Sequence, residues 1–419
     1  MTVDTEATAP PARGTRPRNR RELIVTAARE LFCRHGYANV AMSDIATAVG
    51  IGPSALYRHF RGKQELLHAV VAEALETSLA RLHTAQPGDL GALAREFAEA
   101  ALARRELGVL WQREARHLPA EQHTELGEQL HAARRLFVDQ LTAFRPSLDP
   151  AHAELLAWST LDIAASIAYQ HVELPTPEYP DLIADLVRCV ATADLPDPGE
   201  HATYRPAGGQ ALSHRSRRES LLAAATALFA ERGYASVSLE DTGNAVGIAG
   251  QSIYNHFSSK HEILATAMNR SAERLWLDLA EVLASAHDHA DALRLLVLKY
   301  TQFALAHPHL VTLIVTETEH LPDDERHRTR QTQRDYIDEW LHLMRHVHPD
   351  MSPAEARVRV QAVLTIVNDI ARTPRLRTQS GIAHNVHHLG CTLLGLDSNR
   401  MGHGAAGSNP VAPTGVSSS

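Results

Sequence analysis

The amino-acid sequence contains a long internal repeat. Residues 20–67 align without a gap to residues 217–264, and 22 of the 48 aligned pairs are identical. A weaker match follows in both halves, where the pattern E-x-x-H-L-P stands at residues 114–119 and again at 317–322. The repeat is about 200 residues long, far longer than the unit of a stacked repeat protein. The sequence therefore predicts two similar halves in tandem.

Composition divides the chain further. The stretch between the halves is rich in Pro and Gly, which predicts a linker, and both chain ends offer little to bury. The predicted segments are a disordered basic arm (1–19), a first repeated module (20–67), a first helical body (68–193), the linker (194–213), a second module (214–267), a second body (268–397) and a disordered tail (398–419).

Hydrophobic residues make up 44% of the chain and charged residues 21%, which is a globular composition. The three cysteines, Cys33, Cys189 and Cys391, are far apart and odd in number, so they predict no disulfide framework and suit a reducing compartment. We find no apolar run long enough for a membrane helix and no apolar run at the start of the chain. The sequence predicts a cytoplasmic protein with no membrane partner.

Charge is distributed unevenly. The formal net charge of -8 would argue against a nucleic-acid partner if it were uniform. Residues 1–67, however, hold ten basic and six acidic side chains, whereas residues 68–193 hold ten and eighteen. The basic residues are almost all arginine, the side chain that binds phosphates and guanines in a bidentate manner.

Apolar spacing predicts helices along most of the chain, and few runs alternate as strands do. In the first module we expect one helix that ends before Gly36, then short helices at about 43–49 and 53–60. Further helices are predicted at 63–83, 90–104, 106–116, 120–144, 150–170 and 179–192. Asp149-Pro150 and Ser352-Pro353 each look like a helix cap followed by a first-turn proline. The predicted fold class is all-α.

Two short helices joined at a glycine and packed on a preceding helix describe a helix-turn-helix, whose second helix fits the major groove of DNA. The spacing G-I-x-x-x-x-[LI]-Y-x-H-F-x-x-K-x-E-[LI]-L occurs at residues 50–67 and again at 247–264. It resembles the DNA-binding module of the tetracycline-repressor (TetR/AcrR) family of bacterial transcription regulators. The resemblance covers both modules closely and the remaining helices in order and length only.

The resemblance implies that Tyr57 and His59 contact phosphates and that Lys63 adds a positive charge near the DNA backbone. Base reading would then fall to other polar or small side chains on the two short helices. The predicted DNA-binding residues are Ser43, Pro53, Ser54, Ala55, Tyr57, Arg58, His59, Lys63, Gln251, Ser252, Tyr254, Asn255, His256 and Lys260. Two alternatives stay open: the two histidines could pack against the following helix, and the arginines of the arm could be solvated without touching DNA.

The second module departs from the first. Thr242-Gly243 replaces Ile45-Ala46, which removes a branched core residue and introduces a glycine that costs a helix about 1 kcal/mol relative to alanine. Ala41 stands where Ser238 could cap its helix, so that cap is expected to be weaker in the first module. Gln and Asn side chains are suited to reading adenine. We expect both modules to bind DNA, the second more weakly and with a different sequence preference.

The resemblance also implies a helical body that dimerises and holds a small-molecule effector. A linker of 20 residues spans at most about 70 Å, so the halves can pair within one chain. This predicts a ligand-responsive repressor that acts as a single-chain pseudo-dimer on an imperfect palindrome, with a homodimer as the alternative. Candidate effector-binding residues are Trp111, Gln112, Trp158, Asp162, Thr316, Trp340 and Asn368.

Other functions find less support. We find no nucleophile elbow, zinc-protease, Walker or dinucleotide-binding motif, so no enzyme activity and no cofactor are predicted. The 26 histidines lack the spacing of a structural zinc site, so no metal is predicted. The main alternative is a helical protein-interaction bundle in which one or both modules no longer bind DNA.

Overall fold

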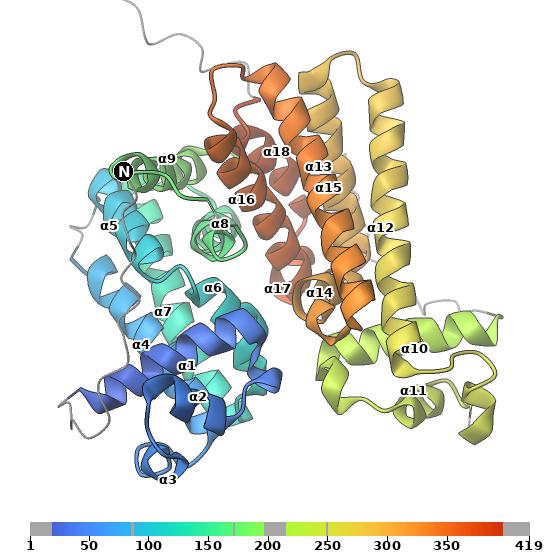
Figure 1. The fold of residues 1–419 in the computed structure, drawn as a ribbon. Helices are drawn as coiled ribbons and strands as arrows, with labels where there is room; N and C mark the ends of the chain where they lie inside the picture. The colour runs from blue at the N-terminus through green and yellow to red at the C-terminus, as the bar shows by residue number, and fades with distance from the viewer. Residues whose placement is uncertain (1–18, 85–87, 171, 197–214, 249, 397–419) are drawn as a thin grey trace, which may run out of the picture.

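The computed structural model describes residues 19–84, 88–170, 172–196, 215–248 and 250–396. Nearly all of the predicted arm and tail, and most of the predicted linker, lie outside these ranges. Within them every regular element is a helix, which confirms the all-α prediction. The halves lie side by side, and both modules are at the same end of the molecule (Figure 1).

The first half contains nine α-helices in the described residues. They are α1 (Arg20–His35), α2 (Met42–Val49), α3 (Pro53–Leu56), α4 (Lys63–Leu82), α5 (Leu90–Ala103), α6 (Leu107–Val109), α7 (Ala120–Phe144), α8 (Pro150–Ile167) and α9 (Glu178–Thr192).

The second half has α10 (Arg217–Arg232), α11 (Leu239–Ala245), α12 (Lys260–Ser285), α13 (His289–Ala306), α14 (Pro308–Thr316), α15 (Asp323–Val347), α16 (Pro353–Arg372), α17 (Pro374–Arg377) and α18 (Ile382–Leu393). A 3₁₀ helix, Gly250–Ile253, stands where the first module has α3.

Most helices begin where the sequence predicted. The Asp149 carboxylate accepts hydrogen bonds from the amides of Ala151 and His152, and the Ser352 hydroxyl accepts one from Glu355, so both predicted caps are confirmed. The predicted module boundaries at 67 and 267 fall inside α4 and α12, so each module continues into its body through one helix.

Two predicted helices differ in the structure. The segment expected as a helix over 53–60 is helical only to Leu56 and then forms a hydrogen-bonded turn. The segment expected as one helix over 106–116 is divided into α6, a π-helix (Leu110–Glu114) and a 3₁₀ turn (Ala115–His117). Gly108 packs so closely on α8 that an added Cβ would lie 2.5 Å from the Ala165 carbonyl oxygen. This contact holds α6 against α8 just before the π-helix begins.

Each module has a core that extends into its own body, and the two bodies share a further core. Buried apolar residues of α1 to α4 cluster with Leu110, Ala115, Leu118 and Leu126 of the first body, and those of α10 to α12 cluster with Leu313 and Leu321 of the second. Most other buried residues of the two bodies form a single continuous cluster. Within it α8 packs on its counterpart α16, and α9 packs on α18. Pairing of equivalent helices is the arrangement of a two-fold dimer interface, here within one chain.

The cap difference between the modules is confirmed. Ser238 forms a complete capping box, in which its hydroxyl accepts from the Asp241 amide and its own amide donates to the Asp241 carboxylate. At Ala41 only the second of these bonds exists, because the side chain has no oxygen.

The structure explains why position 243 is a glycine, which the sequence did not reveal. A Cβ at this position would lie 2.4 Å from the Ile248 carbonyl oxygen and 2.4 Å from Ile253 Cδ1. Ala46, its counterpart, carries its methyl group in the core without such a collision and is 1% exposed. The second module therefore packs its turn and 3₁₀ helix more closely against α11 than alanine would allow.

We expect Gly243→Ala to destabilise the protein by about 1–3 kcal/mol, because overpacking outweighs the helix propensity of alanine. The reverse exchange at the matched site, Ala46→Gly, should cost about 1–2 kcal/mol, from lower helix propensity and from the loss of a buried methyl group. Denaturant unfolding followed by circular dichroism measures both. A Gly243→Ala protein more stable than the parent would contradict this account.

Because the bodies bury their paired helices against each other, we expect a monomer in dilute solution. Light scattering should give a mass near the calculated 45.9 kDa. A mass near twice that value would show instead that two chains pair and that the particle carries four modules.

Candidate nucleic-acid interface

Each predicted helix-turn-helix ends in a segment, 53–60 or 250–257, that buries its apolar residues and exposes its tyrosine. We call these the recognition segments. Leu56 and Phe60 are 0% and 1% exposed, whereas Tyr57 is 52% exposed. In the second module Ile253 and Phe257 are buried and Tyr254 is 54% exposed. A large aromatic ring held in solvent at the same place in both modules suits a surface that contacts a partner.

Most other predicted contact residues of the first module share this surface. Its exposed side chains are Ser43, Pro53, Ser54, Arg58 and His59, and Ala55 is half-buried. In the second module Ser252 and Asn255 are exposed and His256 is half-buried, while the side chain of Gln251 lies outside the described residues. The face of the first module thus offers an arginine where the second offers an asparagine.

Lys63 and Lys260 have another role than the one expected. The Lys63 ammonium donates hydrogen bonds of 2.7 and 2.8 Å to the carbonyl oxygens of Tyr37 and Val40, and it lies 4.2 Å from the centroid of the Tyr37 ring. Lys260 makes the same contacts with the second module's Tyr234 and Val237. Burial lowers the pKa of both lysines. These ammonium groups connect the first turn of a long helix to the loop after α1 or α10, so we leave them out of the proposed interface.

The repeated E-x-x-H-L-P pattern joins each module to its body. In the first half Glu114 accepts a 2.8 Å hydrogen bond from the Tyr37 amide, and His117 stacks on the Tyr37 ring at 4.9 Å. In the second half His320 stacks on Tyr234 at 5.1 Å. Glu114 is 2% exposed, which burial of a carboxylate allows only with such partners. We call the contacts of Glu114 and His117 with Tyr37 the first junction, and the stack of His320 on Tyr234 the second junction.

The second junction also receives a residue from the first half. Glu317 is fully buried, and Arg116 of the first half forms an ion pair with it and donates a 3.1 Å hydrogen bond to the Thr316 carbonyl oxygen. Arg113 donates to the Cys33 carbonyl oxygen at 3.1 Å in its own half and lies 3.6 Å from Glu319 in the other. The segment 110–117 of the first half therefore contacts α1 of the first module and also the second junction.

The body helices line several cavities. One of about 390 Å³ lies between α5 and the start of α9 and has Arg95, Glu96 and Asp181 in its walls. The cavity that we call the first-half cavity, about 100 Å³, is lined by Trp111, Trp158 and Asp162 among others. A further one, about 310 Å³, is lined by Thr316 and Asn368 among others. Gln112 lines the last two. Burial, together with the neighbouring Asp369, raises the pKa of the Asp162 carboxyl well above its usual value.

Trp340 is the exception among the predicted effector residues. Its side chain is 0% exposed and lines none of these cavities, and it packs against Tyr300 and Tyr336 with ring centroids 6.1 and 6.4 Å apart. In this structure the tryptophan is a core residue, and its contact with an effector stays a prediction. Periodicity alone does not distinguish a core-facing residue from one that lines a cavity in that core.

In the described part of the chain, none of the helices combines the length and the apolar character of a membrane span. The same residues include no group of three or more His, Cys, Asp or Glu side chains placed to hold a metal ion.

The modules match a known family. The model of "Bacterial regulatory proteins, tetR family" matches residues 24–70 and 221–267. Both modules therefore belong to the tetR family of bacterial regulatory proteins, and the chain carries that module twice.

Similar proteins are transcription regulators by name. The chain is 31% identical over 103 residues (24% of this chain, 47% of the relative) to the HTH-type transcriptional activator FasR of Mycolicibacterium smegmatis. It is 33% identical over 110 residues (26% and 54%) to the HTH-type transcriptional repressor KstR2 of Rhodococcus jostii. The chain thus spans about half the length of these curated relatives. A solved TetR-family regulator from Bordetella parapertussis is 20% identical, with a TM-score of 0.40, over 43% of this chain and 95% of that one.

The junction histidines predict a pH response. Burial lowers the pKa of His117 to about 4 and also lowers that of His320. The unfolded chain binds a proton below about pH 6.5, and the folded His117 only near pH 4, so stability falls as pH drops through this window. His117→Phe keeps a ring for the stack and cannot be protonated. We expect it to reduce the fall in melting temperature between pH 7 and pH 5, measured by calorimetry.

The matched control is His83→Phe, because His83 is exposed and away from the junction. It should leave that fall unchanged. An identical fall in the parent and in His117→Phe would show that the junction does not titrate.

Proposed function

We propose that this chain is a sequence-specific DNA-binding transcription regulator that uses both modules and acts as a single-chain pseudo-dimer. The observation that supports it most directly is the pair of solvent-held tyrosines, Tyr57 and Tyr254, on equivalent segments at one end of the molecule (Figure 1). Each is flanked by buried apolar residues that fix the segment's orientation. A DNA duplex is the partner that presents two equivalent grooves on one face.

The two modules differ in what they offer to DNA. The first has Arg58 and Arg61 beside its tyrosine, where the second has Asn255 and Ser258. Arginine contributes to phosphate neutralisation and can read guanine in a bidentate manner, whereas asparagine suits adenine. We therefore propose that the first module supplies more of the affinity and that the half-sites differ, so the operator is an imperfect palindrome.

We propose that a small-molecule effector regulates this binding. One of the two relatives is named a transcriptional activator and the other a transcriptional repressor. We favour repression, with ligand binding in the bodies moving the modules apart or together. The junctions support such coupling, since each module is held to its body by a few defined contacts. A DNA target would place the activity in the cytoplasm.

Selection of bound duplexes from a random library tests this function. It should recover two unequal half-sites about one helical turn, ~34 Å, apart. A protein-interaction bundle, the competing function, would enrich no sequence and would show no steep salt dependence on random duplex.

We expect Tyr57→Ala to weaken operator binding about tenfold, the effect of one lost phosphate hydrogen bond with its apolar contact. Tyr254→Ala should weaken it less, because the second module contributes less affinity. Fluorescence anisotropy with the selected duplex measures both. Equal losses would contradict the ranking of the modules.

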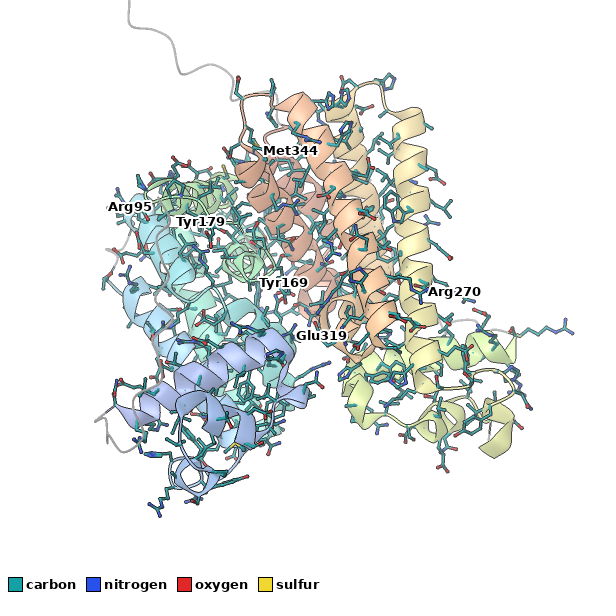
Figure 2. All side chains as sticks on the ribbon, viewed as in Figure 1. Arg95, Tyr169, Tyr179, Arg270, Glu319 and Met344 are labelled. Atoms are coloured by element: carbon teal, nitrogen blue, oxygen red, sulfur yellow. The ribbon has the colours of Figure 1, made fainter. Side chains whose placement is uncertain are left out.

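The control pairs two exposed arginines. Arg58→Ala should reduce the slope of log affinity against log salt by about 0.9 if it neutralises one phosphate. Arg95→Ala, on α5 at the far end of the first body (Figure 2), should leave that slope unchanged.

A further inference from the structure

The cavity of about 310 Å³ lies between the halves and is not confined to one body. Its walls come from α12, α13, α14, α15 and α16 together with Gln112, Arg113 and Tyr169 of the first half. Tyr169 and Glu319, labelled in Figure 2, lie where the two halves meet. We call it the shared cavity.

Every charged residue that lines the shared cavity has a partner within the described residues. Arg330 pairs with Glu319, and Arg113 lies between Glu319 and Glu114. Asp369 accepts hydrogen bonds from Gln112 and, at 3.1 Å, from Arg372. A charged ligand would therefore find no unpaired counter-charge and would have to break one of these pairs.

The remaining walls are aromatic or uncharged and polar. Trp276 and Tyr336 have ring centroids 5.9 Å apart, and Tyr300 adds a third ring 6.4 Å from Tyr336. The Tyr336 hydroxyl is buried, interacts with the indole of Trp340 and makes no hydrogen bond of ordinary geometry. Asn368 accepts a 2.9 Å hydrogen bond from the Tyr300 hydroxyl.

More uncharged hydrogen-bonding groups line the same cavity, namely Asn269, Thr329, Thr332, Gln333, Gln361 and Thr365. Aromatic faces with carboxamides and hydroxyls suit a planar ligand that also carries a hydrogen-bonding group.

We propose that the shared cavity binds one uncharged aromatic molecule bearing hydroxyl or carbonyl groups, and that the first half completes this site through Tyr169. The inference deepens the proposed function, since it identifies the effector class and the site. It concerns binding alone, so it can be tested without DNA.

The first-half cavity does not compete for such a ligand. Its volume of about 100 Å³ is below the range of about 300–1,000 Å³ typical of small-molecule sites. Another cavity of the first half, about 390 Å³, has charged residues and no aromatic ring in its walls, among them Arg95, Glu96 and Asp181. It does not suit an aromatic ligand, so we expect one ligand per chain.

The site also touches both junction segments. Arg113 adjoins Glu114, which holds the first module through Tyr37. Glu319 adjoins His320, which stacks on Tyr234 of the second module. A ligand in the shared cavity therefore lies next to the contacts that attach both modules.

The test uses the full-length protein and three probes of one shape: uncharged 2-naphthol, anionic 2-naphthoate and a cationic 2-naphthyl trimethylammonium. Calorimetric titration should give one 2-naphthol per chain with a dissociation constant below about 1 mM. Both charged probes should bind at least tenfold more weakly. Equal or tighter binding of a charged probe, two sites per chain, or no 2-naphthol binding would overturn the proposal.

Matched substitutions locate the site. Ala272→Phe, on α12, adds a phenyl group to the shared cavity and should abolish binding, whereas Ser78→Phe, on α4, fills the first-half cavity and should leave it unchanged. The opposite pattern would place the ligand in the first half and overturn the proposal.

The contribution of the first half is tested at Tyr169. Tyr169→Ala removes a ring whose hydroxyl donates a 2.7 Å hydrogen bond to Gln112. It should weaken 2-naphthol binding at least fivefold, measured at a temperature at which calorimetry shows the variant folded. If that variant unfolds, nuclear Overhauser contacts in the parent protein test whether the Tyr169 ring touches bound 2-naphthol. The absence of such contacts would overturn the proposal that the first half completes the site. Since no DNA is present, failure here is separate from failure of the library selection.

Discussion

The apolar contact between the two bodies is the interaction on which the rest of the arrangement depends. Helices α8 and α16 contribute fully buried side chains such as Leu155 and Val360 to one continuous core, and each such side chain stabilises the fold by about 1.5–3 kcal/mol. Polar contacts complete the boundary, with His152 3.2 Å from Asn385 and Glu154 2.8 Å from Arg375. With the bodies held in this way, both modules are presented at one end of a single chain (Figure 1).

Duplication did not leave the two halves equivalent. The same E-x-x-H-L-P pattern forms both junctions, but Glu114 binds within its own half, whereas Glu317 pairs with Arg116 of the other. Since Glu317 is fully buried, its carboxylate depends on that cross-half arginine for compensation of its charge. The second module is therefore held by the first half as well as by its own body. The cavities differ between the halves as well. The cavity of about 310 Å³ has aromatic walls, whereas the cavity of about 390 Å³ in the first half is lined by charged residues and has no aromatic ring.

Local patterns predicted local structure well. The helix at 120–144 and the burial of Leu56 and Phe60 beside an exposed Tyr57 follow from spacing, because a helix or turn in a fixed module has one inward face. The π-helix at 110–114 was not predictable, since it depends on the close approach of Gly108 to α8. Lys63 resembled a DNA contact because its neighbours in sequence are predicted contacts. Only the folded loop shows that two backbone carbonyl groups hold its ammonium group.

The sequence by itself determined the all-α class, the tandem repeat and the recognition segments, because periodicity, caps and turn glycines act over a few residues and leave a readable pattern. The tertiary structure alone decided which surfaces pair, why position 243 requires glycine, which tryptophan lines a cavity and which is core, and that one cavity lies between the halves. Those properties depend on packing between different elements, which no local pattern encodes. Some of the contacts join side chains more than 200 positions apart, such as Gln112 and Asp369.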